Sequence, residues 1–380
     1  MLKPRSSTRT SHRSAVTPLF AVLVVVGLTR INPQAAELSE FYDSDDFATV
    51  EKIDAHVHLK TWETEFAERA KAIQMRFLTI AVHSSDPAEM HLRQETAYHQ
   101  QKETPSQVAM IASFPLRGWD EPEWIENTID LIDRSKARGA KGFKVWKDIG
   151  MEFRDANGSL VMIDDPQLRP VIQHIAKNDL VLIGHLGEPK NCWLPIEEMT
   201  VKNDQNYFRR HPEYHMYLHP ELPSYEDQIR ARDALLAAHP NLRFIGAHFG
   251  SLEWSVDALA KFLDRFPKAL VDTAARMGQL QYQSRHNHAR VRQFLIDYQD
   301  RIVYGTDISL AAPVNSEAGF RAAERRWRRD WRYFCTQQEQ TVPELDGTVK
   351  GLQLPREVIN KIYSANMRRL FPEAWSPSEK

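Results

Sequence analysis

The sequence predicts an α/β protein built as a closed (β/α)8 barrel, the TIM barrel, with insertions after the fifth and eighth strands. Short apolar runs with strand character alternate with segments of helical period along most of the chain. Eight such runs separated by helices favour one closed parallel barrel over two domains. Several of the runs end in histidine or aspartate. The runs are residues 51–57, 76–82, 107–113, 140–146, 180–184, 242–247, 268–273 and 301–306.

The composition is that of one large globular domain. Of the 380 residues, 42% are apolar and 26% are charged, which is ample for a large core. We expect three segments: a signal peptide or N-terminal anchor over residues 1–36, a linker over 37–50, and the barrel over 51–375.

The leader carries four basic residues before a nearly continuous apolar stretch over 15–28, which is typical of a secretory signal. We therefore expect export to the periplasm or medium, or attachment to the membrane if the segment is not cleaved. Losing residues 1–36 takes the formal charge from −2 to −7, which argues against nucleic acid as a partner. A homo-oligomer is compatible with the sequence, and export would permit Cys192 and Cys335 to pair.

Helix starts are marked by capping residues between the strands. Asp86 and Asp165 each precede a proline and predict N-caps, and Ser224 and Ser251 are expected to begin two further helices. The helical spacing of Val256, Leu259 and Leu263 is that of a helix covering a sheet.

The most informative motif is Ile53-Asp54-Ala55-His56-Val57-His58. Because side chains alternate in a strand, His56 and His58 project from the same face and can converge on one cation. His185, His248 and Asp307 follow the fifth, sixth and eighth runs in the same way. The carboxyl ends of barrel strands share one rim, so these residues predict a divalent metal site, with zinc favoured and manganese or iron as alternatives.

With these motifs, and the closing Asn366-Met367-Arg368-Arg369-Leu370-Phe371, the chain resembles the amidohydrolase superfamily, specifically its amidohydrolase-2 branch, from residue 50 onward. The resemblance implies that His56, His58, His185 and Asp307 bind metal. It makes His248 either a second-metal ligand or a catalytic or substrate-contacting group. Lys144, at the end of the fourth strand, matches a lysine that is carbamylated and bridges two ions in binuclear members, so one or two ions are expected. A free, substrate-facing or salt-bridged amine is the alternative for Lys144.

The resemblance leaves the reaction open. Hydrolysis of an amide, ester or lactone by a metal-activated water would use Asp307 to accept the water's proton and His248 to stabilise the oxyanion. A non-oxidative decarboxylase would use the same ligands, and an inactive binding barrel would have lost them. We favour hydrolysis because Lys144 and His248 could support a second ion. Arg276 is expected to bind a carboxylate of a small-molecule substrate, and Trp146 to line the pocket.

Two insertions complete the prediction. Residues 193–223, rich in aromatic residues and histidine, are expected to form a lid over the site. An arginine-rich helix after the eighth strand carries Trp327, Trp331 and Phe334 at helical spacing, and we expect this aromatic stripe to pack on the barrel. Its basic face is expected to be solvated.

Overall fold

The computed structural model describes residues 39–311 and 316–376 of the chain. The predicted signal peptide or anchor over residues 1–36 lies outside them. The chain divides into two units, Met1–Ser39 and Glu40–Lys380, and the barrel lies in the second. Among its described helices, none combines the length and apolar character needed to cross a membrane.

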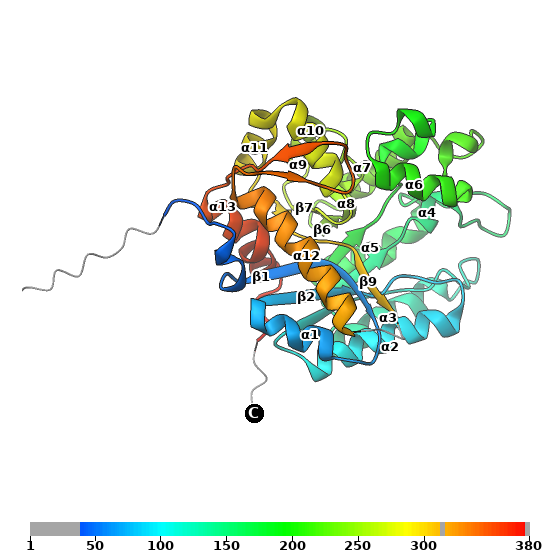
Figure 1. Ribbon diagram of the computed structural model, residues 1–380. Coiled ribbons are helices and arrows are strands. Elements are labelled where there is room, and N and C mark those ends of the chain that lie inside the picture. The colour runs from blue at the N-terminus through cyan, green and yellow to red at the C-terminus, as the bar shows by residue number, and fades with distance from the viewer. Residues whose placement is uncertain (1–38, 312–315, 377–380) are drawn as a thin grey trace, which may run out of the picture. The chain divides into compact units, whose positions relative to one another are not determined.

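The core of the unit is a curled parallel sheet whose strands follow one another in chain order (Figure 1). The eighth strand is interrupted. Its first part pairs with β7 and its second part pairs with β1, so the interrupted strand closes the barrel. This confirms the predicted fold class. The strands are β1 Lys52–Lys60, β2 Met75–Ile80, β3 Val108–Ser113, β4 Gly142–Val145, β5 Val181–Gly184, β6 Arg243–Gly246, β7 Ala269–Asp272, β8 Ile302–Val303 and β9 Ile308–Ala311.

Helices surround this sheet (Figure 1). The predicted caps hold at three positions: Asp86 accepts a hydrogen bond from the Ala88 amide, Asp165 caps a short 3-10 turn, and Ser224 forms a full capping box. The helices are α1 Glu65–Ala70, α2 Pro87–Glu103, α3 Trp124–Ala137, α4 Asp148–Met151, α5 Arg169–Lys177, α6 Lys202–Arg210, α7 Tyr225–Ala238, α8 Ala247–Gly250, α9 Val256–Arg265, α10 Met277–His286, α11 His288–Asp297, α12 Ser316–Cys335, α13 Arg356–Asn360 and α14 Asn366–Leu370.

One local prediction is wrong. Ser251 does not begin a helix: α9 is capped by Ser255, whose side chain accepts from the Ala258 amide. Residues 40–50, within the segment 37–50 that is predicted as a linker, contact α12. Phe47 is fully buried, and the Trp331 indole donates a hydrogen bond of 2.8 Å to the Asp43 carbonyl. Residues 40–50 pack here because Phe47 contacts the apolar side chain of Trp331 on α12.

The described residues form three apolar clusters, two in the barrel and a small third one of Met151, Cys192, Met199, Phe208 and Met216. The larger barrel cluster lies between sheet and helices and includes Trp327, Trp331 and Phe334 of α12, as predicted for the aromatic stripe. The smaller barrel cluster fills the barrel interior, where the carboxyl-terminal residues Phe371 and Trp375 pack against its side chains. The Trp375 indole donates to the Phe77 carbonyl at 2.9 Å. The antiparallel pair β10 Glu339–Thr341 and β11 Thr348–Lys350 follows α12 in the chain.

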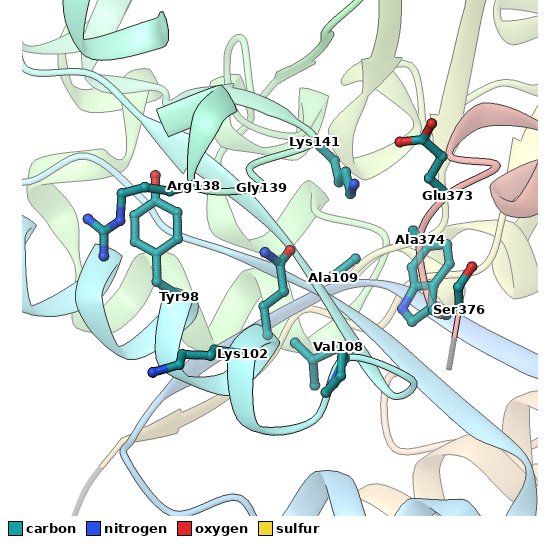
Figure 2. A pocket seen from close by; sticks show the side chains of 13 residues that line it. Tyr98, Lys102, Val108, Ala109, Arg138, Gly139, Lys141, Glu373, Ala374 and Ser376 are labelled. Carbon is teal, nitrogen blue, oxygen red and sulfur yellow. The ribbon is translucent and has the colours of Figure 1, made fainter. Parts of the chain in front are cut away.

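A cavity of about 450 Å³ lies at the amino ends of β3 and β4 (Figure 2). It is lined by Val108, the first residue of β3, and by Lys141, which precedes β4, together with Tyr98 and Trp375. The predicted metal ligands lie at the carboxyl ends of their strands. This cavity therefore belongs to the opposite end of the barrel.

The seam between β1 and the eighth strand is held by the buried Asp54 carboxylate. Its Oδ1 accepts the Thr306 amide at 2.9 Å, and its Oδ2 accepts the Thr306 hydroxyl at 2.6 Å and the Trp327 indole at 3.0 Å. Burial raises the pKa of Asp54 to about 6, although these hydrogen bonds favour its ionised form. One side chain thus ties together β1, the segment before Asp307, and α12.

Replacing Trp327 with Phe should therefore destabilise the protein, because it keeps most of the packing but removes a donor from a buried carboxylate. We expect the free energy of unfolding to fall by about 1–3 kcal/mol, measured by urea denaturation in the presence of a chelator. Trp331→Phe, which removes a hydrogen bond to a neutral backbone carbonyl, is the control and should cost less. Equal costs for the two variants would contradict this account.

Candidate active site at the carboxyl rim of the barrel

The structure gathers the predicted site residues at one end of the barrel. His56 and His58 lie on β1, Lys144 on β4, and His185 and His248 directly after β5 and β6. Together with Asp307, these residues line one cavity of about 730 Å³. The ring centroids of His56 and His248 are 5.0 Å apart, and those of His185 and His248 are 4.2 Å apart.

Three of the histidines use Nδ1 to hold their orientation. His56 Nδ1 lies 2.8 Å from Asp272 Oδ2, His58 Nδ1 lies 2.8 Å from the Ile80 carbonyl, and His248 Nδ1 lies 2.8 Å from the Ala274 carbonyl. Carboxylate and carbonyl oxygens only accept, so each Nδ1 is the protonated nitrogen. In the neutral rings, Nε2 then carries a lone pair. Metal-binding histidines are oriented in this way.

The Asp307 carboxylate lies close to the Nε2 atoms of two of these rings. Its Oδ1 lies 3.0 Å from His58 Nε2 and 3.5 Å from His56 Nε2. Since Nδ1 of both rings is the donor, the short contact between His58 and Asp307 joins two acceptors unless a proton or a cation lies between them. The ligand atoms of His56, His58 and Asp307 all lie within 4.8 Å of one another. They could therefore hold one ion.

Electrostatics keep these groups in the forms that bind metals. Burial lowers the pKa of His56 well below its usual value, and the charge of Lys144 adds to the effect. Burial likewise depresses the pKa of His248, and that of His185 falls to about 4. Burial opposes ionisation of Asp307, but its close contact with His58 and the nearby imidazoles hold its pKa well below the usual range. Neutral imidazoles and a carboxylate therefore meet at neutral pH.

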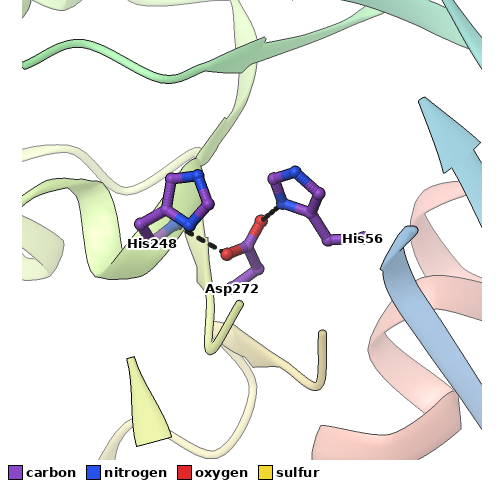
Figure 3. A group of neighbouring side chains, drawn as sticks. All are labelled: His56, His248 and Asp272. Atoms are coloured by element: carbon purple, nitrogen blue, oxygen red, sulfur yellow. Dashed lines mark hydrogen bonds and ion pairs between the residues drawn. The ribbon is translucent and has the colours of Figure 1, made fainter. Parts of the chain in front are cut away.

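Asp272, the last residue of β7, is a site residue that the sequence reasoning missed (Figure 3). Its Oδ2 holds His56 Nδ1, while its Oδ1 accepts the backbone amide of His248 at 2.7 Å. One buried carboxylate thus positions two histidines from different strands. Its sequence signal, an acid ending an apolar run, is the same one that marked Asp307.

His248 lies in a left-handed turn. The φ angles of His248, Phe249, Gly250 and Ser251 lie between 56° and 60°. For residues other than glycine this conformation costs roughly 1–2 kcal/mol each, so tertiary contacts must offset the cost. The turn folds back on β6: a Cβ at Gly246 would lie only 2.9 Å from the Gly250 Cα. Glycine is therefore required at position 246.

Buried side chains hold this turn in place. The Arg232 guanidinium, 1% exposed, donates to the Gly250 carbonyl, and the Tyr225 hydroxyl donates to the Ser251 carbonyl at 2.5 Å. Ser251 Oγ donates to the carbonyls of Leu186 and Gly187, both at 3.1 Å. These last contacts link the His248 turn to the loop that follows His185. The two histidines are therefore positioned together.

His185 differs from the other histidines because its buried Nε2 has no hydrogen-bond partner within the described ranges. The Glu188 carboxylate is the closest ionic group, 3.7 Å away. Glu188, also missed from the sequence, forms a buried ion pair with Lys147. Lys147 is buried and lines the cavity.

Lys144 projects into the histidine cluster. The residue is 2% exposed, and its Nζ lies 3.5 Å from His56 Nε2. Burial lowers the pKa of Lys144 to about 8. No carboxylate of the described residues lies within ion-pair distance of this amine, which disfavours the salt-bridged alternative.

The two predicted substrate contacts also line the cavity. Trp146 is partly buried, and Arg276 is 8% exposed. Nε of Arg276 is buried without a partner among residues 39–311 and 316–376, and its Nη2 lies 3.9 Å from Glu188. From the segment predicted as a lid, Asp204, Tyr207 and Tyr214 reach the cavity wall. Cys192 and Cys335 are both free and buried.

A parallel barrel that gathers histidines and an aspartate at its carboxyl rim belongs to the class of barrel enzymes that carry their functional groups there. The chain is a member of the amidohydrolase family, whose profile matches residues 53–372. The resemblance drawn from the sequence motifs is thus confirmed. No curated protein sequence is detectably similar to the chain.

Solved structures include distant neighbours. An uncharacterised TIM-barrel protein from Bordetella bronchiseptica is 13% identical with a TM-score of 0.49, covering 86% of this chain and 100% of its own. An amidohydrolase from Pseudomonas aeruginosa is 11% identical with a TM-score of 0.42, covering 88% and 99%. A D-hydantoinase is 14% identical with a TM-score of 0.39, covering 68% and 57%. Similarities this low support no inference about function.

Glu253 gives the site region a testable pH dependence. Its Oε1 accepts the Lys190 amide at 2.9 Å, and burial raises its pKa from 4.5 to about 7. The folded state therefore binds more protons than the unfolded state between these values, and stability should fall as pH rises from about 4.5 to 7.

Glu253→Gln should remove the part of this decline that Glu253 causes, roughly 3 kcal/mol over the interval, and Asp54 contributes a separate part in both proteins. Urea denaturation of metal-free wild type and variant from pH 4.5 to 7.5 measures it. The exposed Glu198→Gln is the control. Parallel stability curves for wild type and Glu253→Gln would contradict the prediction.

Proposed function

We propose that the protein is a metal-dependent hydrolase that acts on an amide, ester or lactone bond. The observation that carries the proposal is the convergence of His56, His58 and Asp307, whose ligand atoms all lie within 4.8 Å of one another. His58 Nδ1 donates to the Ile80 carbonyl, and His58 Nε2 lies 3.0 Å from Asp307 Oδ1. A cation shared by these atoms would remove the repulsion between the lone pair of a neutral His58 and the carboxylate.

The donor set fits a divalent ion. Ligand bonds of about 2.0–2.2 Å place neighbouring ligand atoms about 3 to 3.5 Å apart, which is the spacing between Asp307 and the two β1 histidines. His56, His58 and Asp307 would hold the ion, with His185 supplying its unpartnered Nε2. Zinc suits imidazole and carboxylate ligands, and manganese or iron are the alternatives.

When bound, such an ion supplies Lewis acidity and lowers the pKa of an attacking water to about 7. Asp307, held ionised, is placed to accept the proton of that water and return it to the leaving group. Arg276, with donors to spare, would orient a substrate carboxylate, and Trp146 would provide an apolar wall. Solvent access is not blocked at Asp307, whose side chain is 32% exposed.

The hydrogen bonding of His248 supports one of its two expected roles. Its Nδ1 donates to the Ala274 carbonyl, so a neutral His248 presents a lone pair, and not a proton, toward the cavity. It cannot stabilise an oxyanion by donating from Nε2 in this form. A ligand role at a second ion suits it better. Lys144, whose amine lies among the same nitrogens, would bridge the two ions as a carbamate.

Metal content tests the ligand set. The wild-type protein purified without chelator should contain at least one divalent ion per chain, and His56→Ala/His58→Ala should contain about none, as measured by elemental analysis. His174→Ala, which alters a histidine paired with Asp133 outside the cavity, is the control and should keep the wild-type content. Equal metal in the double variant and the wild type would eliminate this site.

Asp307→Asn tests the proton acceptor. On the ester, lactone or amide that the wild type hydrolyses fastest in a panel, we expect a rate loss of about 100- to 10,000-fold. Metal content measured on the same sample separates a lost base from a lost ligand. The exposed Asp297→Asn should leave the rate unchanged. Wild-type turnover in Asp307→Asn would exclude the proposed role.

Reaction type needs its own test, because decarboxylation would use the same ligands. A high-resolution structure of the metal-loaded protein would count the ions and show whether Lys144 is carbamylated. Two ions with a carbamate, and hydrolysis of at least one panel substrate, would support the proposal. One ion, a free Lys144 amine and carbon dioxide release from an aromatic acid would overturn hydrolysis in favour of decarboxylation.

A further inference from the structure

The face of β1 that carries the two histidines continues to Lys60. Residues two apart in a strand share a face, so His56, His58 and Lys60 project to the same side. Lys60 lines the same cavity as the histidines, as does Ser309 of β9, whose strand pairs with this end of β1. The strand therefore places the Lys60 ammonium group at the wall of the cavity, next to the proposed metal ligands.

The Lys60 side chain is partly buried, and its ammonium makes no hydrogen bond or ion pair to any residue that the structure describes, while its backbone pairs with β9. The charged groups that act on it are Arg93 of α2 and, from beyond ion-pair distance, Glu89 and Asp307. The Arg93 guanidinium is fixed by the carbonyls of His83 at 2.9 Å and Val82 at 3.3 Å, and its buried Nε lacks a partner in the described part of the chain. The acid that pairs with Arg93 is Glu89, which lies on the outer surface of α2.

The side chains that line the cavity also include more basic than acidic residues. Six lysines and arginines line it against four acids, although the whole chain has a formal charge of −2. One of the acids, Glu188, already pairs with Lys147, and Asp307 belongs to the proposed metal site. A partly desolvated ammonium without a partner is unfavourable unless an anion joins it.

We propose that Lys60, with Arg93 beside it, forms a subsite for an anionic oxygen group of the substrate. The group is a carboxylate or a phosphate. The subsite would hold it at the cavity wall next to Asp307, so that the bond to be cleaved lies at the histidines while the charged end of the substrate lies on β1. The inference rests on the proposed function for the reaction, but anion binding itself requires no metal.

Calorimetric titration tests the subsite with three probes: succinate, inorganic phosphate and uncharged succinamide. Each is titrated into chelator-treated and metal-loaded wild-type protein at low ionic strength. We expect at least one anion to bind to both forms, and succinamide to bind to neither. Lys60→Met should weaken anion binding by about 10- to 100-fold in the chelated protein, because a charge-assisted hydrogen bond is lost. The stronger of the two anions identifies the group.

Matched variants separate the outcomes. Lys60→Arg should keep binding within several-fold, and Lys71→Met, at an exposed lysine outside the cavity, should leave it unchanged. Equal affinity in Lys60→Met and the wild type overturns the subsite. Anion binding that requires metal and disappears in His56→Ala/His58→Ala also overturns it, while leaving the proposed function intact. If the wild-type protein takes up no divalent ion and still binds the anion through Lys60, the subsite is supported and the metal proposal is contradicted.

Discussion

The Asp54 carboxylate is the interaction on which the rest of the site depends. A barrel needs its last strand to meet its first, and here the eighth strand breaks before Asp307 so that its two parts pair on opposite sides. Asp54 spans the break by accepting both the amide and the hydroxyl of Thr306. Because Asp54 precedes His56 by two residues and Thr306 precedes Asp307 by one, the bonds that close the barrel also set the distance between the histidines and the aspartate. The contacts that close the barrel therefore also bring the site residues together.

Main-chain and carboxylate acceptors determine the orientation of the histidine rings and which ring nitrogen carries the proton. Ile80, Asp272 and Ala274 each occupy one Nδ1, which fixes the tautomer and leaves the opposite nitrogen lone pairs to converge. Burial lowers the pKa of His56 and His248 and so keeps these two rings neutral. Neither effect alone would suffice: neutral rings with free rotation would not converge, and oriented rings that were protonated would repel a cation. A neutral His58 would make the arrangement costly without a ligand, since its lone pair would then face a carboxylate 3.0 Å away.

The fold and the main site residues were predictable because each follows an apolar run, and strand ends converge in a barrel. The sequence showed the histidines and Asp307 for this reason, and Asp272 had the same signal. Other features depend on contacts distant in sequence. The left-handed turn at His248 is locally unfavourable and exists because Arg232 and Tyr225 hold it, so Ser251 was mistaken for a helix cap. Residues 40–50 pack because of α12, and the burial of Lys147 follows from its pairing with Glu188.

The cavity combines two kinds of group that can vary independently. The histidines and aspartates are fixed by the strand ends and by their mutual hydrogen bonds, so a change in any one disturbs the others. Lys60 lies at the end of β1, Arg93 on helix α2 and Arg276 in the loop before α10, and no histidine of the cluster hydrogen-bonds to them. Their charges can be altered without moving the central nitrogens. In the proposed function, the central groups would determine which bond can be activated, whereas the cations on the wall would determine which molecule is held with that bond in place.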